Sequence, residues 1–562
     1  MDLFFVASEA TMLWTATRLI LLVAFILLLH CLRLVITRLY FSPIAKFPGP
    51  RLAAISYWYE GYYDLLSQGG GQFAFQLKRL HGIYGPIVRI SPDELHIDDP
   101  DYYSEIFCNS HPSRPIDKTD LFKYRLNIAE SIVSTVSAED HRLRRAAVAP
   151  FFSKARTRGY NVELQRIADR ISHRLSTEYS GTGRVVHVTH MWSSFTGDMI
   201  RKLAFGLPIT FCDAPGFVSP FPAAMASFIH LAHYSTHFRF LGSIIESVPD
   251  SILLFLLPAA RGIIEYRQVM LYHDQFSFKI SNLIQELRRQ IKVILASHKS
   301  DEHKASDHPT IFHEILASGL LPPKDLSFDR LTQEAMLLNG AGIETTSWSL
   351  TIATFYILSN PSIENRLKEE LMSAVPNPAE ILPWGALEQL PYLSAIVNEG
   401  TLVRDEPNLV AHMQSSHFRP ALRLSFGSVQ RLPRVNRLAT WVYKDYEIPP
   451  NTPVSMDAYH THTDERIFPD PLEFRPERWL GDPMGPDGIH PLSHYLVSFS
   501  RGARGCLGMD LAVMEVYVGL ATIFRRHNMR LFETTRADVD FAIDLVKPVP
   551  KRGSKGVRVT IT

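Results

Sequence analysis

The feature that most constrains this chain is a glycine-rich turn around one cysteine, close to the carboxyl end. The turn runs from Phe499 to Gly508, contains Arg504 and Cys506, and precedes a helical stretch from Met509 to Phe524. A thiolate near a helix N-terminus is stabilised by free backbone N–H groups and by the helix dipole. Glycines let the backbone approach a flat ligand closely. The turn therefore predicts a ligand-binding cysteine.

The same turn supplies what a haem needs from a protein. Cys506 can be the axial ligand, Phe499 offers an apolar face, and Arg504 is suited to a propionate. The alternative is a buried structural cysteine in a tight turn, which would be the better interpretation of a cysteine alone. The fixed spacing of the whole segment favours haem.

Composition excludes several classes of protein. The chain has 562 residues, with 58 Lys and Arg against 57 Asp and Glu, so no basic excess is available for a nucleic acid. Hydrophobic residues make up 46% and charged residues 20%, as in globular proteins. Four scattered cysteines do not form a disulfide scaffold and suggest a reducing compartment.

An apolar stretch near the N-terminus predicts a membrane anchor. Residues 15–36 contain, besides Cys31, only Arg18, His30 and Arg33 as ionisable groups. A stretch of about 20 residues crosses the hydrocarbon core. A cleaved signal peptide is the alternative. Against it, no Lys or Arg precedes Arg18.

The charges around this stretch predict its orientation. Positive residues follow it, at Arg33, Arg38, Lys46 and Arg51. By the positive-inside rule, residues 1–14 are lumenal and the body is cytosolic, which fits the endoplasmic reticulum. Residues 37–50 contain Pro48 and Pro50 and form a hinge.

Periodicity predicts an α+β fold that is mostly helical. Apolar residues between Phe276 and Ile294 recur at three- and four-residue steps, which indicates a long helix, and a second spans Leu331 to Leu358. Val88 and Ile90 with Leu95 and Ile97 indicate a hairpin. Small sheets segregated from the helices fit residues 51–562 as one domain.

The cysteine turn resembles the haem loop of the cytochromes P450, in the style of fungal secondary-metabolism members. The pattern Phe-x-x-Gly-x-Arg-x-Cys-x-Gly is present in full. The resemblance implies a P450-like fold with iron protoporphyrin IX on the axial thiolate of Cys506. It also implies that Phe499, Arg504 and Gly508 belong to the haem site.

A second segment, Ala341 to Thr346, is similar to the family's oxygen-activation motif. A mid-helix glycine costs about 1 kcal/mol against alanine, so Gly342 needs a reason. By the resemblance, Gly342 leaves room for dioxygen, Thr345 holds a water and Glu344 feeds protons. The alternative is a helix packing contact beside an exposed Glu–Thr pair.

Two further segments supply arginines for the haem propionates. His141 to Arg145 resembles the family's Trp-x-x-x-Arg, with His141 in place of tryptophan and Arg145 on a propionate. An exposed basic helix face is the alternative. Arg431 matches a second propionate arginine.

The family's Glu-x-x-Arg helix is interrupted. Glu399 is in place, but the Leu-Arg that should follow lies at Leu422 and Arg423. Deleting residues 401–421 restores the pattern in frame. We therefore expect these residues to be an unspliced intron, the alternative being a real loop insertion. Glu399, Arg423 and Arg478 would then form a buried network.

The interrupted helix also leaves open a second partner for Glu399, the nearer arginine Arg404. Pairing Glu399 with Arg404 is less attractive, since a five-residue step leaves the common helix face.

His460 and His462 have the spacing of a metal pair on a strand. No nearby Cys or carboxylate ligands accompany them, so the sequence does not favour zinc.

Together these motifs predict a membrane-anchored haem monooxygenase. By resemblance it uses dioxygen and electrons from a separate NADPH–cytochrome P450 reductase. Phe228, Phe238 and Phe240 suggest an apolar substrate such as a terpenoid or polyketide. Two alternatives remain: a non-catalytic haem-binding membrane protein, and a haem enzyme that isomerises or dehydrates without a reductase.

Overall fold

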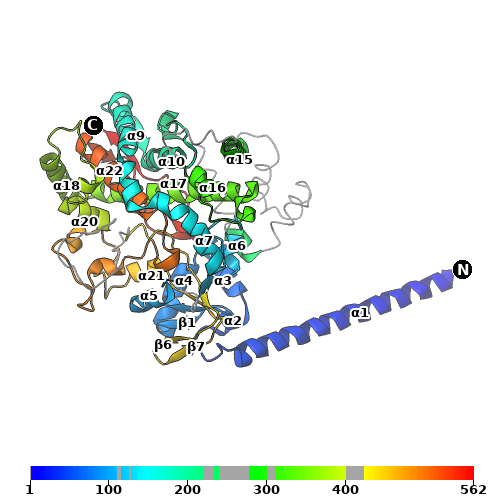
Figure 1. The fold of residues 1–562 in the computed structure, drawn as a ribbon. Helices are drawn as coiled ribbons and strands as arrows, with labels where there is room; N and C mark the ends of the chain where they lie inside the picture. Colours follow the sequence, from blue (N-terminus) through cyan, green and yellow to red (C-terminus); the bar gives the residue numbers. More distant parts are fainter. Residues whose placement is uncertain are drawn as a thin grey trace.

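The chain folds into a body of long helices with short strands in separate small sheets, as Figure 1 shows. This computed structural model describes residues 2–109, 115–125, 128–218, 233–238, 277–299, 310–399 and 423–562. The predicted α+β, mostly helical class is confirmed. Phe228, Phe240 and residues 401–421 lie outside the described residues.

A long helix, α17 (Phe328–Ser359), runs through the centre of the body. It packs against α10 (Val188–Phe205) and α22 (Met509–Arg526), whose apolar faces are buried with it in the main core. The Ser327 side chain accepts from the Arg330 N–H and caps its start. Helix α15 (Ser277–Lys299) also contacts it. Both predicted long helices are therefore present.

The other helices surround this core. Their bounds are α2 Arg51–Ile55, α3 Trp58–Leu65, α4 Phe73–Tyr84, α5 Tyr103–Ile106, α6 Leu121–Arg125, α7 Ala138–Val148, α8 Lys154–Gly159, α9 Asn161–Arg174, α16 Ile311–Ala317, α18 Pro361–Ala374, α19 Trp384–Leu387, α20 Pro391–Glu399 and α21 Ala458–His462.

The largest sheet has five short strands in the order β1-β2-β8-β5-β3. These are β1 Ile87–Arg89, β2 Leu95–Ile97, β8 Pro453–Ser455, β5 Arg434–Asn436 and β3 Ile116–Lys118. The predicted hairpin is β1 and β2, which pair antiparallel with Val88 opposite His96. Strand β8 joins β2 in parallel, so segments more than 350 residues apart share a sheet.

Three smaller sheets complete the fold. One has the order β4-β12-β9, formed by β4 Val185–His187, β12 Arg558–Ile561 and β9 Met529–Leu531. The others are hairpins, formed by β6 Trp441–Tyr443 with β7 Tyr446–Ile448 and by β10 Ile543–Leu545 with β11 Lys547–Val549.

The N-terminal helix α1 (Asp2–Ile36) projects away from the body in Figure 1. Within Trp14–Phe41 the mean hydropathy reaches 2.9 and none of that window is buried, so by length and composition the helix can cross a membrane. The predicted span of residues 15–36 lies inside it.

The predicted hinge, residues 37–50, is attached to the body at its end. A helical turn, Thr37–Phe41, continues α1, and Phe47 is buried against the five-stranded sheet cluster. The Arg89 N–H donates to the Pro48 carbonyl at 2.7 Å. The bend is therefore fixed on β1, which limits any hinge to the residues before Phe47.

Candidate functional site

Cys506 lies at the end of a tight turn, three residues before α22 begins at Met509. Its N–H donates to the Phe499 carbonyl at 2.8 Å, which closes the turn. The side chain of Cys506 is exposed, whereas Cys212 is buried and burial raises the pKa of the Cys212 thiol. The α22 N-terminus favours negative charge on a sulfur placed here. Cys506 is thus placed as a ligand and not as a core residue.

Gly502 and Gly508 have different structural roles in the turn. Gly502 has a φ of +68° and touches the carbonyls of Phe107 and Cys108 where a Cβ would lie, so no other residue fits. A Cβ on Gly508 would meet nothing closer than Phe152, at 3.9 Å. Gly508 therefore leaves space beside the cysteine, while Gly502 fixes the backbone.

A group of cations lies beside this turn; His141 and Arg434 are buried, and Arg145 and Arg504 are partly buried. Arg504 donates to the carbonyls of Thr135 and Val136, both at 2.6 Å, and Arg145 donates to the Gly505 carbonyl at 2.7 Å. Burial and the charge of Arg434 lower the pKa of Arg504 to about 9. The predicted residues Arg145 and Arg504 are thus brought to one place.

His141 and Arg434 complete this group. Burial lowers the pKa of Arg434 to about 10. Burial, followed by the charges of Arg504 and neighbouring cations, lowers the pKa of His141 to about 2. Within the described part of the chain, Arg434 and Arg504 bond only backbone carbonyls. Buried positive charge without a carboxylate requires an anion from elsewhere.

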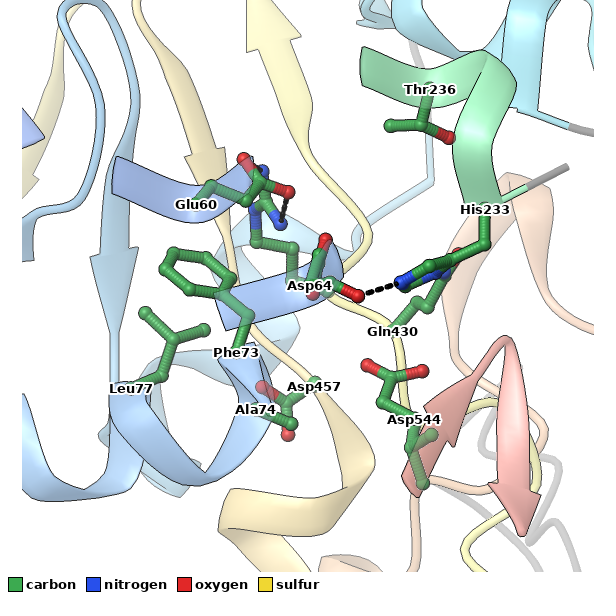
Figure 2. A pocket seen from close by; sticks show the side chains of 12 residues that line it. Glu60, Asp64, Phe73, Ala74, Leu77, His233, Thr236, Gln430, Asp457 and Asp544 are labelled. Atoms are coloured by element: carbon green, nitrogen blue, oxygen red, sulfur yellow. Dashed lines mark hydrogen bonds and ion pairs between the residues drawn. The ribbon is translucent and has the colours of Figure 1, made fainter. Parts of the chain in front are cut away.

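Arg431 occupies a different place from the one predicted. It is buried, and its guanidinium bonds the carboxylates of Glu60 at 2.6 Å and Glu94 at 2.8 Å. Glu60 lines a small polar pocket with Asp64 and Asp544, which Figure 2 shows. Two carboxylates already balance the charge of Arg431, so this geometry does not support a propionate role. Arg434, which sequence reasoning missed, is the better candidate.

The oxygen-activation motif lies on α17 as predicted, with Thr345 exposed. The Thr345 hydroxyl donates to the Ala341 carbonyl at 2.8 Å, the back-bonding that weakens a helix locally. A Cβ on Gly342 would approach the Ile200 side chain on α10 to 3.0 Å. The glycine is therefore explained by helix packing, and the prediction that it leaves room for dioxygen is not supported.

Glu344 has a partner that the sequence did not suggest. Lys547 on β11 forms an ion pair with one oxygen of the buried Glu344 carboxylate. The other oxygen, Oε1, is buried and has no hydrogen-bond partner in the described structure. One side of this carboxylate is thus held in place, and the other is available to a water or a substrate group.

Glu399 forms the centre of a buried network. Arg423 Nε donates to Glu399 Oε2 and Arg478 Nε to Glu399 Oε1, both at 2.9 Å. Trp479 Nε1 donates to Oε2 at 2.8 Å. The three predicted residues therefore lie together, and Trp479 is a further member. Helix α20 ends at Glu399, and Arg423 follows in a turn.

Comparison with known proteins now identifies the class. The family model for cytochrome P450 matches residues 55–401 and 419–552. A cytochrome P450 monooxygenase, orf4 of Eupenicillium brefeldianum, is 39% identical over 535 residues, covering 94% of this chain and 96% of the relative. The monooxygenases sdnE of Sordaria araneosa and tpcC of Cochliobolus heterostrophus are 37% and 36% identical, over 96% and 94% of this chain and 97% and 94% of their own lengths.

The fold and the cysteine turn define a haem-thiolate protein. The chain belongs to the cytochrome P450 monooxygenase family. Family members bind haem through a cysteine thiolate, and the residues present fit that group: an exposed cysteine beside buried arginines that lack a carboxylate partner.

Proposed function

We propose that this protein inserts one oxygen atom of dioxygen into an apolar small molecule. The electrons come from an NADPH–cytochrome P450 reductase, since the sequence shows no flavin or nucleotide motif. The observation that carries the proposal is the unbalanced positive charge of Arg434 and Arg504 beside Cys506. Similarity to the fungal monooxygenases supports it.

In this proposal the haem is held from two directions. The Cys506 thiolate would bind the haem iron, with Phe499 and Gly508 beside the haem. His141, Arg145, Arg434 and Arg504 would hold the propionates. When bound, haem would supply the activation of dioxygen and the transfer of one of its oxygen atoms to a carbon atom.

The protein's own part of the chemistry is proton delivery. Because the Thr345 O–H is donated to Ala341, the hydroxyl oxygen still has a lone pair that can accept from a water. The Glu344 carboxylate, held by Lys547, is placed to exchange protons with such a water. Glu344 would thus act as the acid–base group and Thr345 as the residue that positions the water.

Aromatic and acidic side chains near α3 support the choice of substrate class. Phe238 contacts Trp58, with ring centroids 5.3 Å apart, which supports an aromatic wall on this side. The pocket in Figure 2 adds carboxylates and His233 nearby. A largely apolar molecule with a polar group, such as an oxygenated terpenoid or polyketide, fits this combination.

We also propose attachment to the cytosolic face of the endoplasmic reticulum through α1. Apolar side chains are exposed on the adjoining α2 and α3, among them Leu52, Trp58 and Tyr62. Such a patch next to an anchor suits the headgroup region of a bilayer. The positive residues that follow α1 support the cytosolic orientation.

We propose, finally, that residues 401–421 are an unspliced intron. The family match breaks off after residue 401 and resumes at 419, inside this segment. The Leu424 N–H lies 3.5 Å from the Glu399 carbonyl, so the two ends meet. Sequencing of complementary DNA tests this: a main transcript that retains the segment would overturn it and favour a loop insertion.

Isotopically labelled dioxygen tests the proposed reaction. Membranes containing the full chain and a P450 reductase would be given terpenoid and polyketide substrates with NADPH. We expect products that carry one labelled oxygen atom and that depend on NADPH. Products without the label, formed without NADPH, would favour the isomerase alternative. Haem binding without turnover on any substrate would favour the non-catalytic one.

A further inference from the structure

A second polar cluster lies in the body, centred on the fully buried Asp457. This residue caps α21, and its Oδ1 accepts from the His460 N–H at 2.9 Å. Asp457 Oδ2 lies 2.8 Å from His460 Nδ1 and 3.1 Å from His96 Nε2. His81 joins from α4, with its Nε2 at 2.7 Å from His96 Nδ1. The neighbouring elements α4 and β2 thus meet α21, which is distant in sequence.

The hydrogen bonds of this cluster fix where the protons lie. His81 Nδ1 is 2.8 Å from the Gly85 carbonyl, which can only accept, so Nδ1 carries the proton. The Asp457 carboxylate likewise requires protons on His96 Nε2 and His460 Nδ1. In neutral imidazoles, His81 Nε2 and His96 Nδ1 then both carry lone pairs, yet they lie 2.7 Å apart. Either a shared proton or a metal ion held by both nitrogens resolves this.

The third ring, that of His460, also has a nitrogen to which no hydrogen-bond donor is directed. His460 Nε2 is buried and has no hydrogen-bond partner in the described structure. His96, His460 and Asp457 are at most 2% exposed, and His81 is 9% exposed.

The charge of the cluster also calls for a cation. The Asp457 carboxylate is buried and bonds only imidazoles and a backbone N–H among the described residues. A buried carboxylate favours positive charge at this place. Lys78 donates to Thr463 Oγ1 at 2.9 Å and, among the described contacts, not to Asp457.

We propose that His81, His96 and His460 bind one divalent zinc ion that joins α4, β2 and α21. One ring nitrogen of each lies within 4.8 Å of the others. Zinc takes imidazole nitrogens at about 2.0–2.1 Å, so small side-chain rotations complete the site. Asp457 bonds the ring nitrogens opposite the metal on His96 and His460, the carboxylate–histidine support common around zinc.

This site corrects the expectation drawn from the sequence. His460 and His462 lie on a helix and not on a strand. His462 is no ligand, because its Nε2 accepts from the Val497 N–H at 2.9 Å and its Nδ1 donates to the Arg423 carbonyl at 3.0 Å. Asp457 supplies a carboxylate that supports the rings of His96 and His460 and is not itself a ligand.

Metal analysis of the purified holoenzyme tests the proposal. The full chain is incubated with zinc chloride and freed of excess, and zinc is measured against haem iron. We expect about one zinc per chain, and close to none in His460→Gln or His81→Gln. His494→Gln is the matched control, because His494 is a partly buried histidine outside the cluster, stacked on the exposed His490. Its zinc content should equal that of the parent chain.

Two outcomes would overturn the site. One is zinc content equal in all four proteins, and the other is no retained zinc in the parent, which would assign the contact between His81 and His96 to a shared proton. X-ray absorption at the zinc edge needs no variant, so it decides the matter if the histidine variants fail to fold. Imidazole nitrogens in the first shell support the proposal, and sulfur there contradicts it.

Discussion

Arg431 and Arg434 lie three residues apart and are both buried, yet their surroundings are opposite. Arg431 bonds two carboxylates, Glu60 and Glu94. Arg434 bonds only backbone carbonyls within the described structure. A buried charge that is balanced internally serves the fold, whereas one left unbalanced is provided for a ligand. The charge balance, and not burial, separates the two roles.

The same contrast separates larger regions of the molecule. Around Glu399, two arginines and a tryptophan saturate one carboxylate. Around Cys506, arginines and a histidine whose pKa values are depressed by burial and mutual repulsion lie together. The carboxylate and its partners balance one another in the first region, and in the second the proposed haem propionates would balance the charge.

The largest effect is expected when the complete region is broken. Glu399→Gln leaves Arg423 and Arg478 buried without their carboxylate, which should lower the free energy of unfolding by about 3–5 kcal/mol. Denaturant unfolding of the holoenzyme measures this. Asp470→Asn, which removes an exposed ion pair with Arg475, is the control and should cost at most about 1 kcal/mol. Equal effects of the two variants would refute the contrast.

Substitutions of Arg431 and Arg434 test the contrast between balanced and unbalanced buried charge more sharply. Arg431→Leu strands two carboxylates and should destabilise the fold by about 3–5 kcal/mol. Arg434→Leu strands none, so its main effect should be on haem: losing a charge-assisted bond of about 1.5–3 kcal/mol speeds haem release about 10- to 100-fold. Transfer of haem to an acceptor apoprotein measures the rate. Faster release from Arg431→Leu than from Arg434→Leu would contradict the assignment.

A third effect is a dependence on pH. Burial and the charge of Arg423 lower the pKa of His462 from 6.5 to about 3. Between these values the unfolded chain binds a proton that the folded chain excludes, so stability is lost as the pH falls, by about 1.4 kcal/mol per pH unit. Unfolding measured across this window should show a slope shallower by one proton in His462→Gln. An unchanged slope would contradict the assignment of this proton to His462.

The smallest effect is expected at Lys547. Lys547→Gln removes the cation that holds Glu344, while Lys547→Arg keeps the charge. We expect Lys547→Gln to lower product formed per NADPH several-fold and to shift the pH profile of turnover, and Lys547→Arg to restore both. Lys547→Gln should cost less stability than Arg431→Leu, because Lys547 is only partly buried and a glutamine amide can still donate to Glu344. Equal coupling in both variants would exclude a role for the ion pair.

Local sequence predicted what local geometry determines. The cysteine turn and the two long helices follow from spacing and period over short windows, and the structure has them. Strands such as β3, β5 and β8 have three residues each, too few to show an alternation, and their partners lie far away in sequence. Their pairing could not be predicted.

The same limit applies at the site. Arg431 and Arg434 could not be told apart, since Glu94 lies 337 residues from Arg431. Gly342 could not be assigned to packing without Ile200 on α10. Lys547 and Asp457 acquire their roles only from contacts across the fold.

The reduced, carbon monoxide-bound absorption spectrum tests the central claim most directly. It would be recorded for the full chain, for the chain without residues 401–421, for Cys506→Ser and for Cys31→Ser, an exposed cysteine of α1. The account predicts the Soret band of thiolate-ligated haem in all except Cys506→Ser. The band in Cys506→Ser, or its absence from both the full and the shortened chain, would contradict the claim that Cys506 holds the haem.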